Sequence, residues 1–184
     1  MRPPVSGVIP AVNDFPQLRA FLKSPYSRCV LMHWKLGDLD TVFSSLASQN
    51  KTALVHCDLI SGLSADAAGV EFLARKYSPE GMISTKAVAV AAAKELGVTA
   101  VQRVFLIDSA ALARTAASVS RTGPDYVEFL PAPCPDIFPR LKETFGVPLI
   151  AGGLISSAAD AEKILSHSEI EAVTVSMDTL KQQF

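Results

Sequence analysis

The stretch that decides the fold covers residues 81–103 and has the sequence GMISTKAVAVAAAKELGVTAVQR. Two short runs, Gly81–Ser84 and Thr99–Arg103, flank an alanine-rich segment, Lys86–Leu96, that stops at Gly97. Parallel strands need a crossover of a dozen or so residues between them, and that crossover is usually a helix. The stretch therefore predicts one strand–helix–strand unit of a parallel sheet.

The same alternation continues in both directions from this unit. Eight strands are predicted, over Val8–Val12, Arg28–His33, Thr52–Cys57, Gly81–Ser84, Thr99–Arg103, Tyr126–Leu130, Val147–Ala151 and Ala172–Ser176. Helices are predicted between them, beginning at Phe15-Pro16 after Asn13 and Asp14, then over Leu39–Ser48 (capped by Asp38), Ala67–Lys76 (opened by Asp66), Lys86–Leu96, Ser109–Ser120, Pro135–Phe145, Ala158–Ser166 and a final stub, Asp178–Gln183. Asp at a helix start and Pro in a first turn support these boundaries.

The length of the repeat favours one architecture over another. Each unit takes about 23 residues, whereas a typical eight-unit barrel uses about 31. The sequence thus predicts an α/β fold, a compact TIM-like (β/α)8 barrel with shortened helices. A doubly wound open sheet is the competing architecture, and the first strand lacks the G-x-G-x-x-G turn that usually follows it there.

Composition excludes several classes of protein. The chain has 184 residues, 49% of them hydrophobic, which excludes disorder and favours a single domain over residues 1–184. Its 17 Lys and Arg against 18 Asp and Glu give a net charge of −1, which excludes a general basic coat for nucleic acid. Three cysteines without C-x-x-C spacing predict reduced thiols. With no signal peptide or membrane-length apolar run, we expect a soluble, cytoplasmic protein without membrane contact.

Two glycines mark a candidate anion site. In barrels of this type, phosphate commonly binds at the loops after strands 7 and 8. Here the seventh strand continues into Gly152-Gly153, and the eighth ends at Ser176 before a short helical stub. Backbone N–H groups of adjacent glycines and a helix N-terminus suit an anion. The alternative for the pair is a tight turn in which one glycine has a positive φ.

Charged and polar residues lie at neighbouring strand ends. Asp58 follows strand 3, Lys86 follows strand 4, Gln102 and Arg103 end strand 5, and Glu128 lies inside strand 6. A buried ion needs a partner or a ligand, and Arg103 and Glu128 are able to supply each other. Taken singly, Asp58 has the alternative role of bracing a loop and Lys86 that of a solvated residue. As a set, they suit a small phosphorylated polyol.

Other kinds of site find no support in the sequence. The three histidines, His33, His56 and His167, lack metal-ligand spacing, and the chain has no G-x-S-x-G, P-loop or H-E-x-x-H motif. We therefore predict no metal, no cofactor and no catalytic residue.

Several blocks of the chain resemble the glycerol-uptake operon antiterminator regulatory protein family. The blocks are His56–Gly62 (HCDLISG), Gly81–Lys86 (GMISTK), Gln102–Asp108 (QRVFLID), Pro124–Pro131 (PDYVEFLP) and Ala151–Gly153 with Ile155. They occur in order over nearly the whole chain, and the Q-R-x-F-L-I-D block is the most specific. The resemblance implies a TIM-barrel-like regulator that binds glycerol 3-phosphate and then acts on the leader mRNA of glycerol-catabolism genes.

With glycerol 3-phosphate as the ligand, the residues at the strand ends divide into two groups. We expect the phosphate at Gly152, Gly153 and Ser176, the glycerol hydroxyls at Asp58, Gln102 and Glu128, and neutralising charge from Arg103 and Lys86. RNA binding needs a surface, for which Arg103, Arg114, Arg121, Lys86 and Lys94 form a candidate basic patch. A solvated helix face is the alternative interpretation of that patch. A homodimer would present two copies of this basic patch.

The same phosphate site fits a second function class. A TIM-barrel enzyme such as an isomerase, lyase or synthase acting on a small phosphorylated substrate would use Lys86, Asp58 or Glu128 for chemistry. The fold cannot distinguish this alternative from a non-catalytic regulator, whereas turnover of the ligand can.

Overall fold

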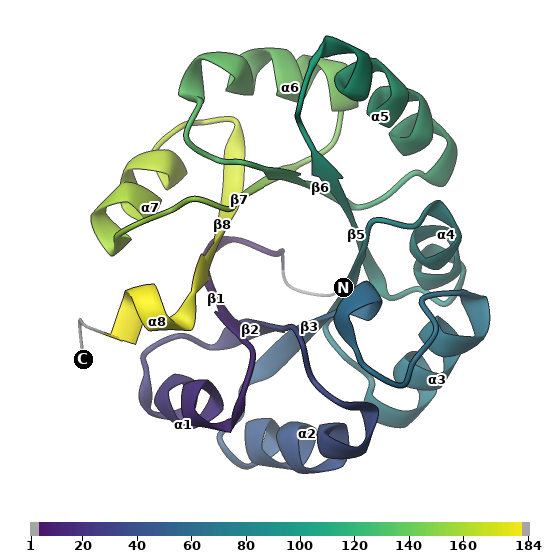
Figure 1. Ribbon diagram of the computed structural model, residues 1–184, viewed down its shortest axis with the longest axis vertical. Coiled ribbons are helices and arrows are strands. Elements are labelled where there is room, and N and C mark those ends of the chain that lie inside the picture. Colours follow the sequence, from purple (N-terminus) through teal and green to yellow (C-terminus); the bar gives the residue numbers. More distant parts are fainter. Residues whose placement is uncertain (1–3, 182–184) are drawn as a thin grey trace.

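Eight parallel strands close into a barrel in the computed structural model, which describes residues 4–181 (Figure 1). Each strand pairs with its neighbours in chain order, and β8 pairs with β1. The strands are β1 (Gly7–Val12), β2 (Arg28–Leu31), β3 (Thr52–His56), β4 (Gly81–Ser84), β5 (Thr99–Phe105), β6 (Tyr126–Leu130), β7 (Leu149–Gly152) and β8 (Ile170–Ser176). The predicted compact (β/α)8 barrel is confirmed, and the open sheet is excluded.

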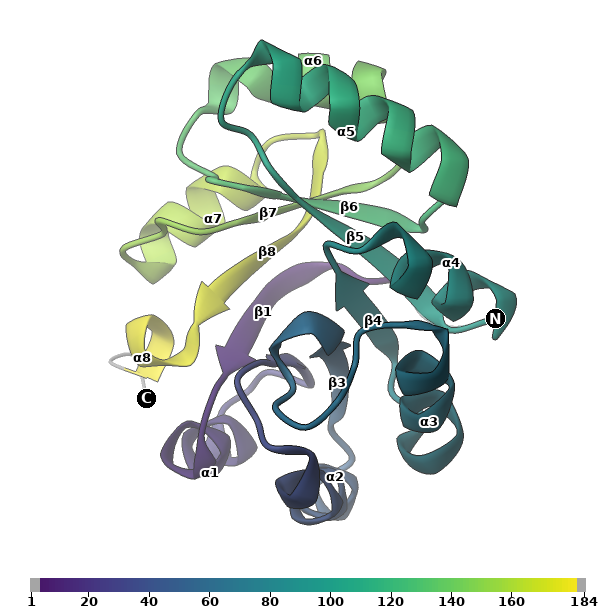
Figure 2. The same cartoon turned by 45° about the vertical axis from the view of Figure 1, so that its right-hand side comes forward.

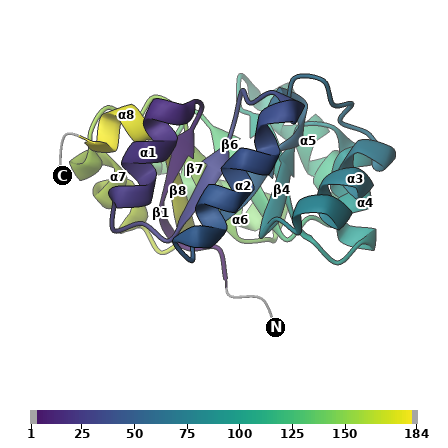
Figure 3. The ribbon, with the colours of Figure 1, turned by 90° about the horizontal axis from the view of Figure 1, so that it is seen from below.

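The helices form a ring around the barrel (Figures 1 and 2). They are α1 (Phe15–Lys23), α2 (Leu39–Ser48), α3 (Ala67–Tyr77), α4 (Ala87–Glu95), α5 (Ser109–Thr122), α6 (Phe138–Phe145), α7 (Ala158–Leu165) and α8 (Met177–Leu180), with 3-10 turns η1 (Leu36–Asp38), η2 (Cys57–Leu59) and η3 (Pro135–Ile137). The four-residue α8 lies beside α1 (Figures 1 and 3), where Gln17 Nε2 donates to Asp178 Oδ2 at 2.8 Å. Within residues 4–181, no helix has the length and apolar character needed to cross a membrane.

Side-chain caps explain where several helices begin. Asp14 accepts from the Gln17 amide at 2.8 Å, Asp66 from Gly69 at 2.9 Å and Asp108 from Ala111 at 2.6 Å, so each satisfies an amide that the first turn leaves open. The first two were predicted as starts from the sequence. Asp38 occupies the cap position of α2 without a side-chain bond, because the chain enters this helix through η1.

The boundaries differ from the predictions in a few places. The second strand ends at Leu31, two residues early, because His33 takes a left-handed conformation (φ 60°) that interrupts an extended chain. The fifth runs on to Phe105. The predicted final stub, Asp178–Gln183, is a helix over Met177–Leu180, and its residues 182 and 183 lie outside the described residues.

Successive side chains along each strand point alternately into the barrel and toward the helices, so the protein has an inner core and an outer core. Residues that point inward fill the barrel with one apolar cluster, made up of Val5, Ile9, Val30, Leu54, Ile83, Val101, Ile150 and Ala172. Residues that point outward pack under the helices in two further clusters. The inner cluster closes the barrel near its middle, so polar side chains further along the same strands lie on an apolar floor.

Candidate functional site

Four polar side chains form a layer inside the barrel, toward the carboxyl ends of the strands. They are His56 on β3, Arg103 on β5, Glu128 on β6 and Thr174 on β8, and all are at least nine-tenths buried. Each stands two residues after a member of the inner apolar cluster or of the side chains packed against it, so period-two alternation points it inward. We call these four residues the polar layer.

An ion pair holds the centre of the polar layer. Arg103 Nε donates to Glu128 Oε2 at 2.6 Å, and one terminal nitrogen of Arg103 donates to Oε1 at 3.0 Å. Thr174 Oγ1 donates to the same Oε1 at 2.7 Å. Glu128 is wholly buried and Arg103 is 8% exposed. The predicted partnership of Arg103 and Glu128 is present, and it fixes the guanidinium in one orientation.

Gly152 makes room for this ion pair. A Cβ at Gly152 would lie 2.5 Å from Thr174 Oγ1 and 3.2 Å from Glu128 Oε1, so any side chain there would displace the Thr174 hydroxyl. Gly153 differs, because it has a φ of +77° that glycine adopts at no steric cost. The glycine pair thus serves both the polar layer and the turn after β7.

His56 is the unsatisfied member of the polar layer. Its side chain is 3% exposed, and Nδ1 has no hydrogen-bond partner within residues 4–181. Asp58 Oδ2 lies 4.0 Å from Nδ1, beyond hydrogen-bond distance. Burial, reinforced by the positive charge of Arg103, lowers the pKa of His56 to about 4, although Glu128 and Asp58 act in the opposite direction. The ring is therefore neutral at pH 7.

Asp58 braces the loop after β4. Its carboxylate accepts from Ser84 Oγ at 2.5 Å, and from the amide and the hydroxyl of Thr85 at 2.6 Å and 2.8 Å. Burial opposes ionisation of Asp58, but these hydrogen bonds outweigh it and hold the pKa of the carboxyl below its ordinary value. The loop-bracing role that the sequence left open is thus present, and it keeps Asp58 ionised beside His56.

Two further predicted residues lie at the rim of the barrel. Lys86 is exposed at the N-cap position of α4, and its amide donates to Ser84 Oγ at 3.0 Å. Ser176 is exposed at the end of β8, where its hydroxyl accepts from the Asp178 amide at 3.3 Å. The carboxyl ends of the strands therefore bring Asp58, Lys86, Arg103, Glu128, Gly152, Gly153 and Ser176 to one end of the barrel.

Gln102 lies outside this group, which corrects one sequence-based expectation. Its amide donates to Ser118 Oγ at 3.0 Å and accepts from Thr122 Oγ1 at 2.6 Å, and both partners belong to α5. Neighbouring residues on a strand point to opposite sides of the sheet, so Gln102 points outward where Arg103 points inward. We therefore leave Gln102 out of the candidate site.

The predicted basic patch also does not form a single surface. Arg103 is buried in the polar layer, and Lys94 pairs with Asp125 at 2.5 Å at the amino end of β5. Lys86 and Lys94 occupy opposite ends of α4, about 12 Å apart at 1.5 Å per residue. Arg103, Lys86 and Lys94 are thus divided between the interior and the two ends of the barrel.

Two members of the polar layer were missing from the predicted site. From the sequence, His56 was considered only as a histidine without metal-ligand spacing, and Thr174 only as part of the predicted strand Ala172–Ser176. The signal that could have identified both is the alternation of side chains along a strand, which points every second residue into the barrel. The same alternation turns Gln102 outward and Arg103 inward. Within residues 4–181, no group of three or more His, Cys, Asp or Glu side chains is placed to hold a metal ion.

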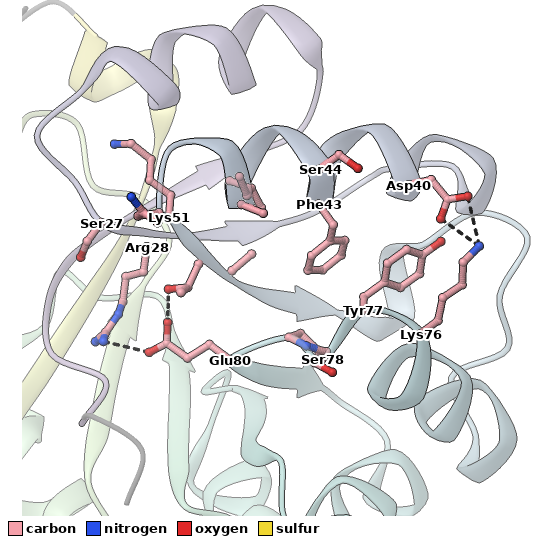
Figure 4. Close-up of a pocket in the computed structure, with 16 residues that line it drawn as sticks. Ser27, Arg28, Asp40, Phe43, Ser44, Lys51, Lys76, Tyr77, Ser78 and Glu80 are labelled. Atoms are coloured by element: carbon pink, nitrogen blue, oxygen red, sulfur yellow. Dashed lines mark hydrogen bonds and ion pairs between the residues drawn. The ribbon is translucent and has the colours of Figure 1, made fainter.

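A pocket of about 810 Å³ lies elsewhere, outside the barrel between α2 and α3 (Figure 4). Phe43 and Tyr77 stack across it with ring centres 4.7 Å apart. Four of its charged groups are paired, Arg28 with Glu80 at 2.8 Å and Lys76 with Asp40 at 2.8 Å, and the fifth, Lys51, donates to the backbone carbonyls of Ser24 and Tyr26. Because the protein itself already supplies partners for these charges, the polar layer is the stronger candidate for a ligand.

Comparison with known proteins identifies the family. A family model described as "Glycerol-3-phosphate responsive antiterminator" matches residues 8–180. The chain belongs to this family. The match covers every strand but the first residue of β1, so the antiterminator family shares the whole barrel and not one motif alone.

Individual relatives agree with the family assignment. The chain is 29% identical to the glycerol uptake operon antiterminator regulatory protein of Listeria monocytogenes, whose crystal structure it matches with a TM-score of 0.89 over 97% of this chain and 96% of that one. A glycerol uptake operon antiterminator-related protein of Thermotoga maritima is 26% identical, with a TM-score of 0.82 over 97% and 99% of the two chains. The uncharacterized protein YgcP of Escherichia coli is 28% identical over 91% of this chain and 87% of its own.

Proposed function

We propose that this antiterminator-family protein binds glycerol 3-phosphate at the carboxyl end of its barrel and, when loaded, acts on the leader mRNA of glycerol-catabolism genes in the cytoplasm. The observation that carries the proposal is the polar layer, a preorganised set of charged groups above an apolar floor. Family membership supports the regulatory role, and the position of the layer agrees with where barrels of this type bind ligands.

The groups at this end match the two halves of the ligand. Arg103 uses two of its N–H groups on Glu128, and its others have no hydrogen-bond partner within residues 4–181, which leaves them for a ligand oxygen. Lys86 forms no ion pair in the same part of the chain, so its ammonium supplies positive charge for a phosphate. Gly153 and Ser176 lie at the loops after β7 and β8, where we place the phosphate.

Exposed apolar side chains at the same end offer a surface for RNA. Phe105, which ends β5, is 52% exposed, and Ile107 and Leu154 are exposed as well. Unpaired bases of RNA loops stack on aromatic rings of this kind. Ligand binding at Arg103 and Gly153 would order the loops that carry these residues, provided that the ordered state binds the ligand more tightly than the free state.

A ligand titration tests the first half of the proposal. Glycerol 3-phosphate at 100 times its dissociation constant is expected to stabilise the protein by about 2.7 kcal/mol, a clear rise in melting temperature, whereas glycerol and inorganic phosphate serve as controls. Lys86→Gln should weaken binding of glycerol 3-phosphate, and Lys94→Gln, at the far end of the same helix, should not. Equal effects of the two substitutions would place the phosphate elsewhere.

RNA binding and turnover test the second half. The leader transcript should bind the loaded protein more tightly than the free protein, and a transcript of scrambled sequence should bind neither. Absence of RNA binding in both states would overturn the antiterminator role and leave the ligand site standing. Glycerol 3-phosphate should be recovered unaltered after long incubation, and a new product would favour the barrel-enzyme alternative.

A further inference from the structure

His56 has hydrogen-bonding capacity that the barrel itself does not use. Arg103, Glu128 and Thr174 satisfy one another, whereas neither ring nitrogen of His56 has a hydrogen-bond partner within residues 4–181. Leaving a buried polar group without a partner is unfavourable, and such groups in native proteins often mark a ligand position. His56 is also the polar-layer residue that the proposed function above leaves without a role.

The surroundings of the ring determine which nitrogen carries the proton. The ring is neutral, so it holds one N–H and one lone pair. The charged or titratable groups that act on it are Arg103, Glu128, Asp58 and His33. Asp58 is ionised and presents Oδ2 at 4.0 Å from Nδ1, so a proton on Nδ1 is attracted and a lone pair there would be repelled. The favoured tautomer carries its proton on Nδ1.

The other nitrogen is then an acceptor directed at the ligand. Of the two nitrogens, only Nδ1 is fully enclosed without a partner, and Nε2 is not enclosed in this way. Because His56 points into the barrel above Leu54, Nε2 meets the space over the apolar floor. The positive charge of Arg103, which also acts on the ring, favours a lone pair over a second N–H. His56 therefore presents an acceptor to the ligand, while its one N–H is on Nδ1 and is directed toward Asp58.

We propose that His56 selects ligands with an alcohol, and rejects those with a carbonyl, at the carbon next to the phosphorylated one. This inference rests on the proposed binding of glycerol 3-phosphate. The C2 hydroxyl of glycerol 3-phosphate donates a hydrogen bond to Nε2. The keto analogue, dihydroxyacetone phosphate, has only acceptor lone pairs at C2, so two acceptors would face each other.

The neighbouring side chains strengthen the discrimination. The carboxylates of Asp58 and Glu128 are acceptors as well, so a carbonyl directed at either of them gains no hydrogen bond. A site built to accept from a hydroxyl loses most of its affinity for an analogue without one, because its polar groups stay unpaired. The protein would thus respond to the alcohol and not to its oxidation product.

Parallel titrations of the two compounds test the proposal. The wild-type protein should bind glycerol 3-phosphate on the order of 100-fold more tightly than dihydroxyacetone phosphate. His56→Gln places an amide there that rotates to donate or accept, so the ratio should fall to within about tenfold, with improved binding of the ketone. Lys86→Gln is the matched control: it should weaken both compounds and keep the ratio.

The outcomes separate this inference from the proposed function. Equal binding of both compounds by the wild-type protein, or an unchanged ratio in His56→Gln, would overturn the selectivity and leave the ligand site in place. Binding of neither compound would overturn the proposed function and the selectivity with it. Should His56→Gln fail to fold, ring 15N shifts of His56 in the wild-type protein at pH 7 decide the point: a proton on Nδ1 is expected, and a proton on Nε2 would overturn the proposal.

Discussion

Replacing Glu128 with alanine removes the carboxylate at the centre of the polar layer and leaves a buried guanidinium without its partner. Glu128 accepts three hydrogen bonds, two from Arg103 and one from Thr174, and it is wholly buried. Each bond to a charged group contributes about 1.5–3 kcal/mol, and breaking a buried pair by removing one partner costs about 3–5 kcal/mol. Since Arg103 is 8% exposed and can regain some hydration, we expect a loss of about 4 kcal/mol in the free energy of unfolding.

Urea denaturation followed by circular dichroism at pH 7 measures this loss. Two variants isolate its cause. Thr174→Val removes only one of the three bonds, so it should cost about 1.5–3 kcal/mol. The double variant Arg103→Met/Glu128→Leu leaves no unpaired ion, and it should lie within about 2 kcal/mol of the wild type. A loss below about 1 kcal/mol for Glu128→Ala, or an equal loss in the double variant, would refute the argument that an unpaired buried charge sets the cost.

Three further predictions concern other parts of the site. The pKa of His56 is about 4 in the folded protein, against an ordinary value of 6.5, so the unfolded chain takes up the proton first as the pH falls. The free energy of unfolding should therefore drop by about 3 kcal/mol between pH 6.5 and 4. Urea titrations of His56→Gln should lack this drop, and parallel pH curves for the variant and the wild type would contradict the prediction. Gly152→Ala should cost about 2–4 kcal/mol in the same assay, since its Cβ displaces the Thr174 hydroxyl, whereas Gly37→Ala, with nothing within 4 Å, should change stability by less than about 0.5 kcal/mol. Phe105→Ala should weaken binding of the leader transcript roughly tenfold, the loss of one stacked base, while the affinity for glycerol 3-phosphate stays constant; a matching loss of ligand affinity would assign Phe105 to the ligand site instead.

Much of the architecture follows from signals that are local in the chain. The alternation of short apolar runs with alanine-rich segments sets the order of strands and helices, and caps such as Asp14 and Asp66 set where helices begin. These signals involve residues three or four positions apart, so they need no knowledge of the fold. Where these signals gave a wrong boundary, the cause was also local. The apolar residues before His33 predicted a strand up to His33, but the left-handed backbone of His33 ends the strand earlier.

The make-up of the site depended on closure of the barrel. Arg103 and Glu128 lie 25 positions apart, and Glu128 and Thr174 lie 46 apart, so only the register between strands brings their polar atoms within hydrogen-bond distance. The same register explains why position 152 is a glycine, because the atoms that a side chain there would meet belong to β6 and β8.

Composition and motifs determined which chemical groups the chain carries, and tertiary structure decided which of them meet. The sequence placed Gln102 and Arg103 together at a strand end, yet the sheet turned one toward α5 and the other into the barrel. It left His56 out of the predicted site, yet the barrel set that ring where the charges of Arg103 and Glu128 act on it. The physical reason is that hydrophobic periodicity specifies which side of a strand is inward, whereas the stagger of eight strands around a closed barrel specifies what each inward side chain faces.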